Sequence, residues 1–112
     1  VETLWVEPRA ALGRYWDHGM RLAPPQIMSL SHLARFATPG QAIEDARSRR
    51  PGLVEPESFT VDSRRVLVYP GDTRHSVVER ALPGPTRLYW RNDRFEPEHG
   101  FDGFFEAGSA GR

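Results

Sequence analysis

The polar side chains that could do chemistry are concentrated in one loop, Pro70-Gly71-Asp72-Thr73-Arg74-His75-Ser76. Asp72, His75 and Ser76 are the residue types of a hydrolytic triad, in which a base activates a hydroxyl nucleophile. Three near neighbours on one loop seldom hold a nucleophile against its base and an oxyanion hole. Proline and glycine are typical of a turn, which an aspartate can cap. We therefore interpret the loop as structural and predict no catalytic residue in this chain.

The four histidines, His18, His32, His75 and His99, are the next candidates, because imidazole is a common metal ligand. Their spacing contains neither an H-x-x-x-H pair nor an H-E-x-x-H motif, which would place two of them on one helix face. The sequence also lacks cysteine, which excludes thiolate zinc sites, disulfides and cysteine nucleophiles. We expect no metal site and interpret the histidines as surface or capping residues.

Arg21 and Gln26 are the candidate substrate-binding residues. They flank Pro24-Pro25 before a predicted helix, where backbone N–H groups and the helix dipole favour an anion such as phosphate. The alternative is a proline-initiated helix beside a solvated arginine. Aromatic side chains could also stack on a base, but their helical and strand spacing favours positions in the core. These aromatic residues are Trp5, Trp16, Trp90, Tyr15 and Tyr89.

The elements that must position these residues begin with three helices in residues 1–50. Apolar residues at helical spacing predict a first helix around Ala11–Trp16 that ends before Gly19 as its C′ residue. A second helix is predicted over Pro25–Ala37, and a third over Pro39–Arg50, introduced by a Thr38-x-x-Gln41 capping box. The apolar stripe expected on the second helix is Ile27, Leu30, Leu33, Ala34 and Ala37.

Strands follow the helices, because the apolar period changes from 3.6 to 2 after Pro51-Gly52. Asp62-Ser63 and Asn92-Asp93 are typical of tight hairpin turns, since these residues tolerate positive φ. The predicted strands are Ser58–Asp62, Arg64–Tyr69, Thr86–Trp90 and Arg94–Glu96. The expected fold class is α+β, with three helices followed by a small antiparallel sheet. We interpret residues 1–112 as one unit, with a mainly helical segment 1–50 and a β-rich extension 51–112.

Composition narrows the function classes. Fifteen basic residues, all arginine, balance fifteen acidic ones, so the chain lacks the broad positive field that favours nucleic acid or anionic membranes. The absence of lysine excludes a Schiff-base or P-loop lysine. No apolar run approaches the ~20 residues of a membrane-spanning helix. We expect a cytoplasmic protein that binds neither nucleic acid nor membrane.

Three segments resemble the part of certain Nudix hydrolases that follows their catalytic helix. Thr3–Leu12 contains a W-x-x-P-x-x-A-L sequence from Trp5 onward, and Gly19–Gln26 is similar to an L-x-P-P-T segment, with Gln26 in place of threonine. Leu30–Ala34 continues the similarity. The resemblance is to the acyl-CoA and nucleotide diphosphatase subgroup, and it covers the first half better than the strands.

The resemblance implies the C-terminal, substrate-side portion of a hydrolase of nucleoside diphosphate-linked compounds. In that family, glutamates of the box G-x5-E-x7-R-E-x2-E-E-x-G hold divalent cations. This sequence has no such box, so magnesium or manganese is implied only for a complete enzyme. An apolar strand at Leu4-Trp5-Val6 indicates a partner for its edge. We expect either an upstream catalytic half or, alternatively, a non-enzymatic module that binds another protein or itself.

Overall fold

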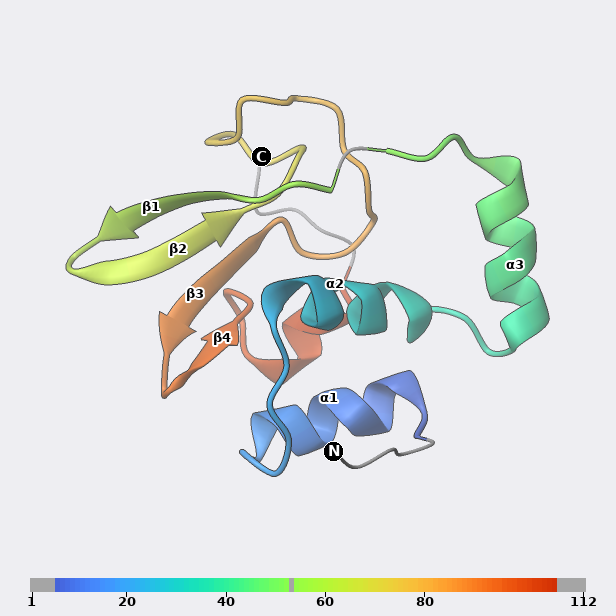
Figure 1. Cartoon of the computed structure of the whole chain (residues 1–112), viewed down its shortest axis with the longest axis horizontal. Coiled ribbons are helices and arrows are strands. Elements are labelled where there is room, and N and C mark those ends of the chain that lie inside the picture. The colour runs from blue at the N-terminus through green and yellow to red at the C-terminus, as the bar shows by residue number, and fades with distance from the viewer. Residues whose placement is uncertain (1–5, 53, 107–112) are drawn as a thin grey trace.

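The computed structural model describes residues 6–52 and 54–106. Three helices precede a four-stranded antiparallel sheet, which confirms the α+β class (Figure 1). The predicted strand at Leu4-Trp5-Val6 lies mostly outside the described residues, and Val6 itself is in coil. The elements are α1 (Pro8–Trp16), α2 (Pro24–Leu33), α3 (Pro39–Ser48), β1 (Glu57–Val61), β2 (Arg64–Val68), β3 (Arg87–Arg91), β4 (Arg94–Glu96) and a 3-10 turn, η1 (Phe101–Phe104).

The sheet has the order β1-β2-β3-β4, and two of its connections are tight turns. Asp62 and Ser63 have φ of 51° and 65°, and Asn92 and Asp93 have φ of 54° and 60°. Two consecutive residues with positive φ match the right-handed twist of a hairpin, and short polar side chains tolerate that conformation. Both predicted hairpins are therefore confirmed.

One face of the sheet packs against α1 and α2 to form the core. Leu67 of β2 lies opposite Leu88 of β3, and Trp90 lies opposite Phe95 of β4, so these side chains share a face. α1 and α2 lie beside each other next to the β3–β4 hairpin (Figure 1). The buried core comprises Leu12, Tyr15, Ile27, Met28, Leu67, Tyr69, Leu88, Phe95 and Phe104.

The buried face of α2 differs from the predicted stripe. Ile27, Met28 and Ser31 are buried, whereas Leu33 is 43% exposed. The hydroxyl of Ser31 donates a hydrogen bond to the carbonyl of Phe104, which places this polar residue on the inner face of the helix. Ile27 and Leu30 of the predicted stripe do contact the core, but the prediction was wrong at Leu33 and missed Ser31, because a serine with a backbone partner can be buried.

Two helix ends also differ from prediction. α2 ends at Leu33, four residues before Ala37, because Arg35 and Phe36 donate to the carbonyls three residues back and tighten the chain into a turn. After α1, His18 adopts the left-handed conformation with φ 61°, the role predicted for Gly19. The Thr38 cap is as predicted, since its hydroxyl accepts from Gln41 N at 3.2 Å.

α3 stands apart from the rest of the fold, and no residue of it is buried (Figure 1). The C-terminal end of α3 is attached to α2 by the side chains of Asp45, Arg49 and His32. Arg49 binds Asp45 at 2.6 Å and donates to Nε2 of His32 at 3.2 Å. No described helix is long and apolar enough to cross a membrane.

Candidate functional site

Asp72, His75 and Ser76 each serve the loop structure and do not form a triad. The Asp72 carboxylate accepts two hydrogen bonds from Arg87, at 2.7 and 2.8 Å. Nδ1 of His75 accepts from Val77 N at 2.9 Å, so in the neutral ring Nε2 carries the proton and donates to Glu55 O at 2.8 Å.

The remaining member of this trio, Ser76, is bound by a carboxylate. Its hydroxyl and its backbone N–H both donate to Glu57, and these hydrogen bonds lower the pKa of the Glu57 carboxyl. His75 has no ring nitrogen left to take a proton from Ser76. The structural interpretation of the loop is therefore consistent with its hydrogen bonds.

The four histidines have separate surroundings. His18 lies near Arg94, His32 binds the end of α3, His75 is buried in the loop, and His99 lies beside Glu98. Within residues 6–52 and 54–106, no three His, Cys, Asp or Glu side chains form a group that could hold a metal ion.

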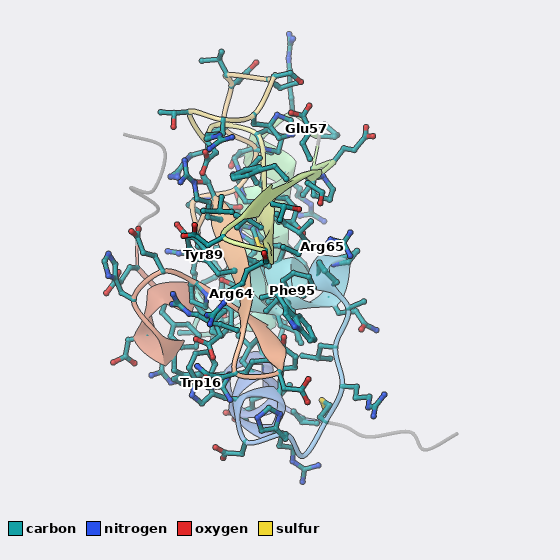
Figure 2. All side chains as sticks on the ribbon, turned by 90° about the vertical axis from the view of Figure 1, so that its left-hand side faces the viewer. Trp16, Glu57, Arg64, Arg65, Tyr89 and Phe95 are labelled. Carbon is teal, nitrogen blue, oxygen red and sulfur yellow. The ribbon has the colours of Figure 1, made fainter. Side chains whose placement is uncertain are left out.

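Arg21 lines a pocket of about 460 Å³, which we call the Arg21 pocket. It lies between the α1–α2 loop and the β3–β4 hairpin. Figure 2 shows Glu57, the partner of Ser76, in the upper part of the molecule and Phe95, which lines the pocket, lower down. The pocket and the polar loop share no residue. Its polar and aromatic lining includes Tyr15, His18, Arg21, Trp90, Asp93 and Arg94.

The walls of the pocket are held together by Tyr15 and Arg94. The Tyr15 hydroxyl donates to Phe95 O at 3.0 Å and accepts from Phe95 N at 2.7 Å, so it acts as a substitute strand partner along β4. Burial raises the pKa of Tyr15, which keeps the hydroxyl protonated. The Arg94 guanidinium lies 3.9 Å from the Trp16 ring centroid and donates to Trp16 O at 2.8 Å. These contacts join α1 to the sheet edge.

Arg21 and Gln26 have different environments. The guanidinium of Arg21 makes no hydrogen bond or ion pair with any residue that the structure describes. Gln26 does not line the pocket, and its Oε1 accepts from Ala23 N at 2.8 Å. Pro24 and Pro25 occupy the first two helical positions and carry no N–H, which weakens the helix N-terminus as an anion site.

Trp90 lines the same pocket and is 41% exposed, although its spacing predicted a place in the core. The ring is held edge-to-face against Phe95, with centroids 5.0 Å apart. A fixed and accessible indole can stack on a planar ring. The charges in the pocket are mixed, because Asp93 is also present and Arg94 is paired with Glu96 at 2.8 Å. Arg21 is thus the basic group best placed to bind a ligand anion.

Comparison of the chain with known proteins finds no matching family model, no matching curated protein and no matching solved structure.

Proposed function

We propose that this chain forms the C-terminal, substrate-side portion of a Nudix-like hydrolase that acts on nucleoside diphosphate-linked compounds. In this proposal the Arg21 pocket contacts the substrate, and the catalytic glutamate box belongs to an upstream half. The observation that carries the proposal is the Arg21 guanidinium, which has no partner among the described residues and lines a pocket together with the partly exposed Trp90. A guanidinium recognises phosphate, and an indole stacks on a nucleobase.

The dimensions of the pocket suit this class of ligand. Its volume of about 460 Å³ lies within the ~300–1,000 Å³ of small-molecule sites. The described residues do not offer a fitting magnesium or manganese site, so the chain's own part is to bind and orient substrate.

Methionine NMR can test the proposal, because the chain contains two methionines, and the Arg21 pocket is lined by Met20 but not by Met28. With 13C-labelled methionine methyl groups, titration with ADP is expected to shift the Met20 signal and leave Met28 in place. Arg21→Gln is expected to raise the dissociation constant about tenfold, roughly 1.4 kcal/mol. Arg47→Gln is the matched control, because Arg47 is exposed on α3 and outside the pocket. Its dissociation constant should equal that of the unmodified chain.

An unmoved Met20 signal at ~10 mM ADP, roughly ten times a weak dissociation constant of ~1 mM, would overturn the proposal. So would an equal loss of affinity in Arg21→Gln and Arg47→Gln. One observation favours the alternative of an interaction module, namely that β1 is an outer strand of the sheet and pairs only with β2 among the described residues. A chain that does not bind ADP but is shown by light scattering to form a dimer would support that alternative.

A further inference from the structure

A second pocket, of about 420 Å³, lies between α2 and the residues that flank β1 and β2. We call it the Tyr69 groove. It shares no lining residue with the Arg21 pocket, so an inference about it does not rest on the proposed function. Its walls are mainly apolar, which favours a ligand with an apolar body. The apolar lining residues are Pro25, Met28, Leu33, Val54, Pro56 and Leu82.

Tyr69 provides an unpaired hydrogen-bond donor at this groove. The residue is only 3% exposed, and its hydroxyl oxygen is buried without a hydrogen-bond partner among the described residues. Burial raises the pKa of Tyr69 to about 12, so the hydroxyl is protonated at neutral pH. Buried hydroxyl groups usually have a partner, because burial removes their hydrogen bonds to water. The Tyr69 hydroxyl is therefore a donor that no acceptor among the described residues satisfies.

His32 provides a second donor at the same groove. Arg49 Nη2 lies 3.2 Å from Nε2 of His32, and a guanidinium can only donate, so Nε2 is the acceptor. In the neutral ring the proton then lies on Nδ1, which is buried and has no partner among the described residues. Burial lowers the pKa of His32, with Arg49 and Arg35 contributing and Asp45 opposing, so the neutral ring is favoured.

We propose that the Tyr69 groove binds a small uncharged molecule that has an apolar body and a carbonyl oxygen as hydrogen-bond acceptor. Tyr69 and His32 each have a hydrogen to donate to a ligand acceptor, and a protonated Nδ1 of His32 cannot accept one in return. The apolar walls disfavour a charged ligand, because burying an unpaired charge is strongly unfavourable. Ketones and esters of drug-like size fit this description.

The test uses two probes of similar shape, acetophenone and ethylbenzene, of which only the first carries a carbonyl oxygen. Both are titrated into the full chain with 13C-labelled methionine methyl groups. Met28 lines the Tyr69 groove and Met20 does not, so binding is expected to shift the Met28 signal alone. ADP, in contrast, is expected to shift Met20, which separates this test from that of the proposed function.

Tyr69→Phe removes only the hydroxyl group. It is expected to weaken acetophenone binding about five- to tenfold and to change ethylbenzene binding less than about twofold. The ratio of the two probes' dissociation constants is compared between the unmodified chain and Tyr69→Phe, so the difference in hydration between the probes cancels. Tyr89→Phe is the matched control, because Tyr89 lies on β3 outside the groove, and it should change neither affinity. The variant should fold, since the lost hydroxyl has no partner among the described residues.

Three results would overturn the inference. The first is a Met28 signal that neither probe moves. The second is that both probes bind but Tyr69→Phe does not change the ratio of their affinities. The groove would then be an apolar surface that does not recognise a carbonyl group. The third is a shift of Met20 alone, which would assign both probes to the Arg21 pocket.

Discussion

Replacement of Asp72 by alanine should be among the most destabilising single changes in the sheet region. The Asp72 side chain is completely buried and accepts hydrogen bonds from Arg87, from Thr86 Oγ1 at 2.9 Å and from Arg74 N at 2.9 Å. Arg87 belongs to β3, so the carboxylate attaches the loop after β2 to the next strand. Its removal leaves all of these donors without their partner.

The expected loss of folding free energy in Asp72→Ala depends on how exposed the remaining Arg87 side chain is to water. Breaking a buried ion pair by removing one partner destabilises proteins by ~3–5 kcal/mol. The Arg87 side chain is 20% exposed, so water partly solvates the remaining cation, and we expect about 3 kcal/mol, the lower end of that range. Asp102→Ala is the control. Asp102 and its partner Arg9 are 82% and 60% exposed, and an exposed pair is worth about 0–1 kcal/mol.

Urea denaturation of both variants, followed by circular dichroism, measures these losses. The double variant of Asp72→Ala with Arg87→Met removes both charges, so it should recover part of the stability that Asp72→Ala alone loses. The reasoning would be refuted if Asp72→Ala and Asp102→Ala cost the same. It would also be refuted if the two changes in the double variant were simply additive.

The ion pair also predicts a pH dependence. Burial by itself raises the pKa of Asp72, but hydrogen bonds from Arg87, Arg74 N and Thr86 outweigh it and leave the pKa below its usual value. A folded-state pKa below the unfolded value of ~3.9 contributes stability that is present above about pH 4 and is lost as pH falls through the folded pKa. The stability difference between the unmodified chain and Asp72→Asn should therefore shrink below about pH 4.

Three further predictions concern packing, α3 and catalysis. Leu12→Ala should cost about 2–5 kcal/mol in urea denaturation, because Leu12 is fully buried, whereas Leu33→Ala at a 43% exposed position should cost much less; equal losses would contradict the assigned faces. Burial lowers the pKa of His32 in the folded chain. The contribution of the neutral ring to folding stability is therefore complete above the unfolded-state pKa of ~6.5 and declines as pH falls below it. If His32→Asn and the unmodified chain lose stability equally between about pH 7.5 and pH 5.5, this prediction is contradicted. With magnesium or manganese, the purified chain should release no phosphate or nucleotide from ADP-ribose or CoA esters, since it has no Nudix box; metal-dependent release abolished by a mutation in this chain would refute the point.

Local features of the fold could be predicted because they depend on a few neighbouring residues. Asp62-Ser63 and Asn92-Asp93 reverse the chain because their short polar side chains tolerate positive φ. Thr38 begins α3 because its hydroxyl reaches an N–H three residues ahead. Arg21 lines a pocket, but the helix N-terminus that suggested it has prolines without an N–H at its first two positions, so its role in binding stays a prediction.

The pocket itself and the buried face of α2 were decided by tertiary contacts. Ser31 is buried because the Phe104 carbonyl, 73 residues away, accepts its hydrogen bond, and apolar spacing alone therefore misplaced the inner face. The Tyr15 hydroxyl hydrogen-bonds to the backbone of Phe95 on β4, 80 positions away, and both residues line the Arg21 pocket. The sequence could not predict that the donors of Tyr69 and His32 have no partner in the described part of the chain, because whether a polar atom has a partner depends on what packs around it. Local patterns determine turns and caps, whereas distant partners determine which side chains are buried, paired or left free to bind.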